Sequence, residues 1–284
     1  MILQQVARPR GPYSLALTAR RAGDATRRFR DGALTAVLPG GELAGARQLP
    51  DGAVVLRAES EEALERLRFV LALDDDHSEF LRRFARDPLV GEAARRARGL
   101  RQLRVPTVAQ SLLRAFCGQL IESRRARALE ARIVRATTPA RPGTSLHEPP
   151  GAAALARLSA AELRAHGLHA RRAAALLRVC ESVDLEGLRA HPTRVVAARL
   201  ARERALGPWS AGVVCLEGLG RREHGLVGDL GLVKVLRALR GRPVEAWETE
   251  ELLAPYGEWA GLASVYVLHA YGAGLLPVPR RAAA

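Results

Sequence analysis

The spacing of apolar and polar residues changes near residue 60. Before that point, Tyr13, Leu15 and Leu17 alternate with small or polar residues, and Asp31-Gly32 and Asp51-Gly52 each precede a short apolar run. Alternation with a period of two is typical of strands, and Asp-Gly is a common hairpin turn. We therefore expect a β-rich N-terminal domain, built as a small antiparallel sheet over residues 1–72.

From Ser60 onward, apolar residues recur at intervals of three and four, which is the spacing of amphipathic helices. Ser60 and Ser78 are each placed to cap a helix, because their hydroxyls can accept a bond from an N–H of the first turn. The proline-rich segment 139–150 is predicted to be a flexible connector. Another helix is expected from Thr107, with one apolar stripe: Val108, Leu112, Phe116 and Leu120. The fold class is therefore expected to be α+β, with the helices after the sheet.

The charge of the chain indicates a polyanionic partner. Its 284 residues include 44 lysines and arginines against 30 acidic residues, a formal net charge of +14, and Lys234 is the only lysine. Such an excess favours a nucleic acid as the partner, and a lysine Schiff base would have a single candidate. No apolar stretch is long enough to span a membrane, and the N-terminus does not have the pattern of a secretory signal.

Cysteine and histidine spacing argues against a metal centre. The three cysteines, Cys117, Cys180 and Cys215, are far apart in apolar helical contexts, without a CxxC pair. This excludes a zinc ribbon and a four-cysteine iron–sulfur cluster, and buried free thiols in a reducing cytoplasm fit best. His166 and His169 are three residues apart but have no cysteine or carboxylate at ligand spacing, so no metal site is expected.

The segment from Leu206 to Leu236 holds the residues best suited to chemistry. Gly207 and Pro208 begin an apolar helix whose free N–H groups can face a phosphate, although alone this pattern favours an ordinary corner between two helices. Asp229 precedes a second apolar helix, and alone it is best interpreted as an N-cap. A carboxylate there can also stabilise positive charge at a deoxyribose C1′ during glycosidic cleavage. One cap position can serve both roles.

Two further features have both a structural and a functional interpretation. Leu120 follows Gly118 and Gln119 where the Thr107 helix should end. It can wedge into a base stack from which a base is extruded, or complete the apolar core stripe, and the sequence favours neither. The C-terminal aromatic residues are expected to pack in the core, with one or two able to stack on a base: Tyr256, Trp259, Tyr266 and Tyr271.

Taken in their order along the chain, four segments of the sequence resemble those of the helix-hairpin-helix DNA glycosylase superfamily, and within it those of the AlkA-like DNA-3-methyladenine glycosylase II branch. The resemblance covers almost the whole chain. It rests on LRFVLALDDDHSEFLRRFARDPLV, VAQSLLRAFCGQLIESRRARAL, LSAAELRAHGLHARRAAALLRVC and GDLGLVKVL. It implies a helical core of two lobes. Residues 73–104 together with 220–284 would carry the catalytic aspartate, and residues 105–219 would carry the wedge turn and the hairpin.

The resemblance also implies roles for single residues. Asp229 becomes the catalytic carboxylate, and Trp209 stands where lyase-active relatives carry a Schiff-base lysine. A monofunctional enzyme with water as the nucleophile is therefore expected. The DNA-binding residues implied are Gln119, Leu120, Leu206, Gly207, Trp209 and Ser210. The base pocket is expected near Trp209, Val213, Tyr266 and Leu268. The implied substrate is double-stranded DNA with alkylated purines such as 3-methyladenine, acted on by a monomeric, cytoplasmic enzyme of base-excision repair.

The hairpin departs from the family pattern, which usually reads Leu-Pro-Gly-hydrophobic-Gly. Here it reads Glu203-Arg204-Ala205-Leu206-Gly207. Ala205 replaces a glycine that often has a positive φ, at a cost of about 1 kcal/mol if that geometry is kept, and Glu203 adds a negative charge. These changes leave open whether the hairpin holds a phosphate or a bridging monovalent cation. No other cofactor is expected.

Alternatives to the alkylated-purine enzyme remain. On the same fold the chain could be a glycosylase for oxidised or deaminated bases. From a different class, it could be a non-catalytic binder of DNA lesions, against which Asp229 argues. An endonuclease III-like lyase is disfavoured, because the chain lacks the cysteine cluster and the lysine of such enzymes.

Overall fold

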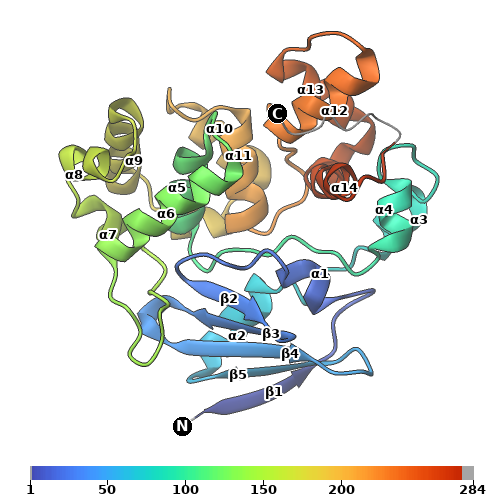
Figure 1. The fold of residues 1–284 in the computed structure, drawn as a ribbon. Coiled ribbons are helices and arrows are strands. Elements are labelled where there is room, and N and C mark those ends of the chain that lie inside the picture. Colours follow the sequence, from blue (N-terminus) through green and yellow to red (C-terminus); the bar gives the residue numbers. More distant parts are fainter. Residues whose placement is uncertain (1, 277–284) are drawn as a thin grey trace.

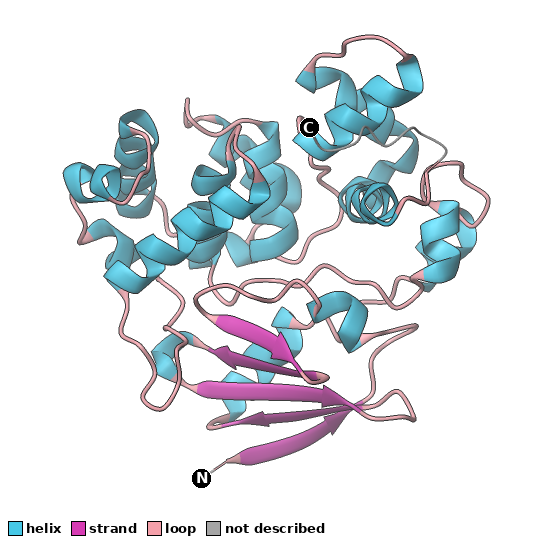
Figure 2. Ribbon diagram, viewed as in Figure 1, coloured by secondary structure: helices cyan, strands magenta, loops and turns pink. Residues whose placement is uncertain are grey.

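The computed structural model describes residues 2–276, and a five-stranded sheet forms its N-terminal part (Figures 1 and 2). The strand order is β1-β5-β4-β3-β2, and every neighbouring pair is antiparallel. This confirms the predicted small antiparallel sheet. The strands are β1 (Leu3–Ala7), β2 (Arg27–Arg30), β3 (Ala33–Val37), β4 (Leu43–Gln48) and β5 (Val54–Ala58).

The predicted turns of the sheet are correct, but one predicted strand is wrong. Asp31 and Gly32 both have positive φ (51° and 74°) between β2 and β3, as a tight two-residue hairpin requires. The segment with Leu15 and Leu17, by contrast, is helix α1 (Leu15–Ala19). Ser14 caps it by accepting a hydrogen bond from the Leu17 N–H. The alternation of apolar and polar residues suggested a strand here, but the cap at Ser14 starts a helix.

Helix α2 (Glu61–Val70) packs against β5, β4 and β1. Ser60 is its N-cap, as predicted, and accepts a hydrogen bond from the Ala63 N–H. The second predicted cap is wrong: His77 precedes α3 (Ser78–Arg83) and Ser78 is its first residue. The Ser78 N–H donates to Asp76 Oδ1 at 2.8 Å, so the aspartate holds the start of the helix.

Beyond α2 the described chain is helical, as predicted. Figure 1 shows two groups of helices above the sheet: α5 to α11 form one, and α3, α4 and α12 to α14 form the other. The remaining helices are α4 (Gly91–Arg96), α5 (Val108–Gly118), α6 (Ser123–Thr137), α7 (Ala152–Ala156), α8 (Ala160–Ala165), α9 (Ala170–Ser182), α10 (Thr193–Ala201), α11 (Pro208–Val213), α12 (Leu230–Arg240), α13 (Thr249–Leu253) and α14 (Ala260–Ala273).

Three clusters of buried apolar side chains underlie this arrangement. The first joins the sheet to α1 and α2, and includes Leu34 and Leu67. The second is built on α5, α6 and α9 and includes Phe116. The third joins α3 and α4 to α12 and α14 around Phe80, whose ring lies 5.1 Å from that of Tyr266 and 5.8 Å from that of Trp259. The exact domain boundaries remain a prediction, and residues 277–284 of the last lobe lie outside the described range.

Segment 139–150, predicted to be a flexible connector, is held against the sheet domain. Ala140 and His147 form a β-bridge, and the His147 N–H donates to the Ala25 carbonyl at 2.7 Å. Arg141 forms an ion pair with Glu59 at 2.7 Å. The prolines prevent regular structure here, but side-chain and backbone bonds fix the segment.

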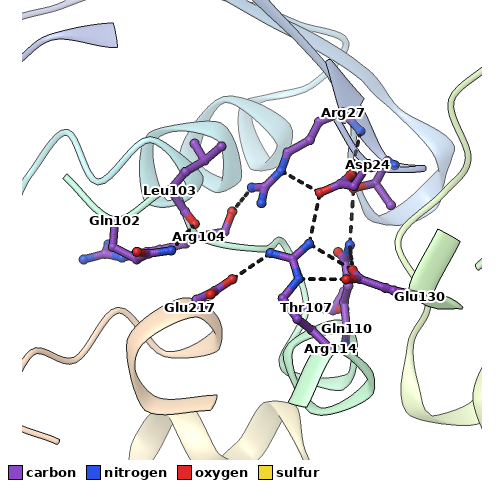
Figure 3. Close-up of polar contacts among 11 residues, drawn as sticks. Asp24, Arg27, Gln102, Leu103, Arg104, Thr107, Gln110, Arg114, Glu130 and Glu217 are labelled. Atoms are coloured by element: carbon purple, nitrogen blue, oxygen red, sulfur yellow. Dashed lines mark hydrogen bonds and ion pairs between the residues drawn. The ribbon is translucent and has the colours of Figure 1, made fainter. Parts of the chain in front are cut away.

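A buried ion-pair network connects the sheet domain to α5 and α6 (Figure 3). Arg114 of α5 lies at its centre, 3.0 Å from Asp24, 2.9 Å from Glu130 and 2.6 Å from Glu217. Asp24 also accepts from Arg27 at 3.1 Å. Burial alone would raise the pKa of the Asp24 carboxyl, but the cations of Arg27 and Arg114 outweigh it and lower that pKa to about 2. The network thereby fixes the helix that ends in the predicted wedge turn.

The three cysteines lie in the interior of the protein. Cys117, Cys180 and Cys215 are free and buried, as predicted, and burial raises the pKa of Cys180 and of Cys215 to about 12. Thiolates are therefore scarce at neutral pH at these positions.

Within residues 2–276, none of the helices has the length and apolar character needed to cross a membrane.

Candidate functional site

The turn after α5 exposes Leu120. The helix ends at Gly118, Gln119 is its C-cap, and Leu120 has a φ of 56° and is 81% exposed. The other members of the predicted stripe, Val108, Leu112 and Phe116, are fully buried. Leu120 therefore does not complete the core stripe. A large apolar residue held outward in a left-handed conformation is instead available to an external partner.

The predicted hairpin connects α10 to α11. Gly207 is the N-cap of α11 in an extended conformation (φ −86°, ψ −179°), and Pro208 begins the helix. Ala205 is not among the described non-glycine residues with positive φ, so the expected strain at this position is absent. The charge of Glu203 is offset by an ion pair with Arg199 at 3.2 Å. Both departures from the family pattern are therefore accommodated within the turn.

Gln119 joins the Leu120 turn to this hairpin. Its side-chain amide donates to the Ala205 carbonyl at 2.7 Å and to Ser210 Oγ at 3.1 Å. Ser210 is buried, whereas Gly207 is exposed. The structure thus brings together Gln119, Leu120 and the hairpin, which the sequence separates by more than 80 residues. Leu206 is buried in the cluster of α5 and α9 and anchors the turn from behind.

Asp229 is the N-cap of α12, as its position predicted. Its Oδ1 accepts the N–H groups of Gly231 at 2.7 Å and Leu232 at 3.3 Å. Its Oδ2 accepts the indole Nε1–H of Trp209 at 3.0 Å. Three donors therefore orient this carboxylate from two separate helices, which is more than a cap requires.

Trp209 spans the distance between the wedge turn and the carboxylate. At its far edge, a Cβ added to Gly118 would lie 2.6 Å from Trp209 Cη2, so only glycine fits there. At the other edge, its Nε1 reaches Asp229. The ring is half-buried against the C-terminal core. One aromatic side chain thus sets the spacing of Leu120, the hairpin and Asp229.

The predicted base-pocket residues lie at different depths. Leu268 of α14 packs directly over Gly231, beside Asp229, and is half-buried. Val213 of α11 is 4% exposed and belongs to the C-terminal core cluster. Tyr266 is fully buried, and its hydroxyl donates toward the carbonyls of Ala97 and Leu100 at 3.3 and 3.1 Å. The phenol therefore packs within the core, with its hydroxyl bonded to backbone carbonyls, and does not face a base in this structure.

The C-terminal aromatic residues pack as expected, but one exposed tryptophan near the site was not singled out from the sequence. Tyr256, Trp259 and Tyr266 are buried, whereas Trp247 is 62% exposed. It lies on the short 3₁₀ turn Ala246–Glu248, next to Thr249, whose Oγ1 accepts the Gly228 N–H at 2.7 Å. This bond fixes the turn beside Asp229. A single exposed aromatic residue has no periodicity, so only the fold could locate it.

The site offers no basis for a metal or a Schiff base at Asp229. Among residues 2–276 there is no group of three or more His, Cys, Asp or Glu side chains placed to hold a metal. Lys234 lies on the exposed surface of α12, more than a helical turn beyond Asp229. The position next to the carboxylate is filled by the indole of Trp209.

Similarity to known proteins was assessed in sequence and in structure. No family model matches the chain. A DNA-3-methyladenine glycosylase of Bacillus subtilis is 26% identical over 229 residues, which cover 77% of this chain and 75% of that protein. A 3-methyladenine DNA glycosylase from Archaeoglobus fulgidus superimposes with a TM-score of 0.77 at 19% identity, over 94% of this chain and 98% of the other.

An 8-oxoguanine glycosylase/lyase of Clostridium acetobutylicum, in complex with double-stranded DNA, superimposes equally well. Its TM-score is 0.80 at 16% identity, over 96% of this chain and 98% of the other. The chain has the fold of the helix-hairpin-helix DNA glycosylases. This confirms the resemblance and the fold class predicted from the sequence. Because the structures with this fold include both a 3-methyladenine DNA glycosylase and an 8-oxoguanine glycosylase/lyase, the reaction must be inferred from the residues of the site.

Proposed function

We propose that this protein is a monofunctional DNA glycosylase that hydrolyses the N-glycosidic bond of alkylated purines, such as 3-methyladenine, in double-stranded DNA. The observation that carries the proposal is the Asp229 carboxylate, held by two backbone N–H groups and by the Trp209 indole beside the exposed Leu120 turn. The resemblance to 3-methyladenine glycosylases in sequence and in fold supports the same reaction class.

In this mechanism the damaged nucleotide is extruded from the duplex, and Leu120 fills the gap that it leaves. Such an exposed apolar side chain compensates part of the lost stacking. Gln119 fixes the Leu120 turn to the hairpin. The N–H groups after Gly207 then face the phosphate backbone, since a helix N-terminus favours an anion.

The bond between C1′ and the base nitrogen breaks with its electron pair moving to the base. A cationic alkylated purine thereby leaves as a neutral molecule, and positive charge builds up at C1′. Asp229 stabilises that charge, because a preoriented carboxylate in a site with little water lowers the barrier. Water then bonds to C1′ and releases one proton to solvent, which leaves an abasic site.

The residues around the carboxylate are consistent with hydrolysis without strand cleavage. A lyase reaction needs an amine at C1′, and Trp209 occupies the corresponding position with an indole that cannot act as a nucleophile. Trp209 and Leu268 place apolar surface next to Asp229, and Trp247 is exposed on the turn that leads into Thr249, which binds Gly228. We assign the base-binding side of the site to these three residues.

The proposal is tested by incubating the protein with methylated DNA and identifying the released bases. We expect free 3-methyladenine, an intact strand at the abasic site, and no covalent protein–DNA product after borohydride treatment. Release only from duplexes with a single oxidised or deaminated base would instead support the alternative specificity. Tight binding to lesions without release of any base would identify a lesion binder, and strand cleavage would refute the monofunctional reaction.

A further inference from the structure

A strongly basic concavity lies along α6, between this helix and the segment that leads into β2. Its volume is about 410 Å³. We call it the arginine cleft, and it is lined by Gly23, Asp24, Arg28, Arg124, Arg127, Ala128, Ala131 and Arg135. These residues belong to the sheet domain and to α6. The cleft is formed by the junction that the Arg114 network holds together (Figure 3).

The lining residues of α6 occupy one face of the helix. Residues 124, 127, 128, 131 and 135 recur at intervals of three and four, whereas Leu129 and Ile133 of the opposite face are buried in the core. Ala128 and Ala131 are short, so they form a floor between the arginines. From Arg124 to Arg135 the helix rises by roughly 16 Å. The arginines therefore form a row and not a single point of charge.

The positive charge of this row is not neutralised by the protein. Arg124, Arg127 and Arg135 are exposed, and none of them is in an ion pair within the described part of the chain. Arg28 donates to the Ser145 hydroxyl at 3.1 Å, which leaves its charge unbalanced. Nearby, burial and the cations of Arg20 and Arg127 lower the pKa of Arg21, consistent with crowding of like charges.

Among residues 2–276, Asp24 is the only acidic residue that lines the cleft, and its carboxylate is engaged in buried ion pairs. The carboxylate is 7% exposed and binds Arg27 and Arg114 in the buried network (Figure 3). Four arginines thus face a concave surface without an opposing acid. Four like charges at one exposed surface create a positive potential that attracts anions, so the cleft is suited to an anionic ligand.

The length and position of the row favour a polymer of phosphates over a single phosphate. Each strand of duplex DNA carries one phosphate per about 3.4 Å of axis, so a row of this length meets several of them. Helix α6 starts at Ser123, three residues after Leu120, so the cleft continues from the wedge turn. We propose that the arginine cleft binds the phosphate backbone of the duplex that flanks the extruded nucleotide, which rests on the proposed function for the choice of DNA as the partner.

The test compares two double variants that remove the same formal charge. R127Q/R135Q removes two arginines of the cleft, whereas R164Q/R178Q removes two exposed, unpaired arginines of α8 and α9 within the described chain. The measurement is the affinity for an undamaged 30-base-pair DNA duplex as a function of salt concentration. Unchanged melting temperatures of both variants, expected because the four side chains are exposed, confirm that folding is intact.

We expect R127Q/R135Q to reduce the slope of log affinity against log salt by about 1 to 2, since each lost phosphate contact removes about 0.9. Its loss of affinity should then be roughly 4- to 16-fold greater at 50 mM than at 200 mM salt. R164Q/R178Q should retain the wild-type slope. Equal slopes for the two variants, or a slope change seen with duplex RNA but not with DNA, would overturn the proposal.

This readout is independent of catalysis. An absence of base release by the wild-type protein would refute the proposed function and leave the slope comparison unaffected. If base release is observed, R127Q/R135Q should reach the wild-type rate at saturating protein, because neither residue belongs to the site around Asp229. A reduced rate at saturation would show that the arginines act on the reacting nucleotide and would also overturn the proposal.

Discussion

The Trp209 indole Nε1 lies 3.0 Å from Asp229 Oδ2, and this hydrogen bond ties the hairpin helix α11 to the start of α12. The same ring lies against Gly118 at the end of α5. An N-cap aspartate requires only the backbone N–H groups of its own helix. The additional donor from a second helix is what distinguishes Asp229 from an ordinary cap.

Replacing Trp209 by phenylalanine should reduce base release while binding of damaged DNA changes little. The ring is kept, but a hydrogen bond to a charged group, worth roughly 1.5–3 kcal/mol, is lost. This corresponds to a rate reduced by about 10- to 100-fold in single-turnover assays. Trp247→Phe is the comparison variant: it also replaces an indole on the base-binding side of the site but leaves the bonds of Asp229 intact, so a larger loss in W209F isolates the contribution of the hydrogen bond. Equal rates for W209F and the wild type would mean that the bond does not orient the carboxylate for chemistry.

Replacing Leu120 by alanine should weaken binding to a duplex with a lesion without lowering the melting temperature. The side chain is 81% exposed, so the core loses nothing. A leucine inserted into DNA buries apolar surface, and shortening it should reduce the affinity by about 10-fold. Leu239→Ala serves as the control, since Leu239 is also an exposed leucine, on α12. If both variants bind alike, Leu120 is not the wedge.

Replacing Arg114 by methionine should lower the free energy of unfolding by about 3–5 kcal/mol. The carboxylates of Asp24, Glu130 and Glu217 would lose their shared cation in a buried environment, and uncompensated buried charges are strongly destabilising. Urea unfolding measures the effect. Arg178→Met on the exposed surface of α9 should change the stability by less than about 0.5 kcal/mol. Similar effects of the two substitutions would contradict the structural role of the network.

Asp24 should make stability fall in acid. Its pKa is lowered to about 2 in the folded protein, from a reference value of 3.8. The pKa of Asp24 is lower in the folded protein than in the unfolded chain. The stabilisation is therefore fully present above pH 3.8 and is lost as the pH falls from 3.8 toward about 2. Between pH 7 and pH 3 this group alone accounts for a loss of about 1 kcal/mol. Urea unfolding over this range should show a shallower decline for D24N than for the wild type, and parallel declines would contradict the assignment.

Local signals in the sequence predicted much of the fold. Ser60 caps the helix that it was expected to cap, the helix expected from Thr107 is present as α5, and Asp31-Gly32 forms its hairpin turn. Each of these signals acts within three or four residues along the chain. Leu15 was misassigned to a strand because the alternation of Tyr13, Leu15 and Leu17 was given more weight than the N-cap at Ser14, which begins a helix. Ser78 was misassigned because Asp76 is the better acceptor.

The candidate site could be predicted only in part, because its contacts are long-range. The sequence pointed to Asp229 and to Leu120, but it left the core stripe as an equal explanation for Leu120. Only the fold shows that this side chain lies outside the core, 81% exposed. Likewise, the Trp209–Asp229 bond joins two elements 20 residues apart, and no pattern of spacing encodes it. Trp247 lies in no regular pattern of apolar residues. Only the structure shows that its turn leads into Thr249, which binds Gly228 next to Asp229.

The central claim is that the Asp229 carboxylate stabilises the charge that develops at C1′, and Asp229→Asn tests it most directly. Asparagine caps a helix about as well as aspartate, so the variant should fold normally and retain its binding to methylated DNA. Glu258→Gln, an exposed acid elsewhere on the C-terminal lobe, is the matched control and should behave as the wild type. The measurement is single-turnover release of 3-methyladenine from methylated DNA. We predict a rate at least about 100-fold lower for D229N, since loss of a preoriented electrostatic group costs roughly 2.7–4 kcal/mol. Release at close to the wild-type rate would contradict the account.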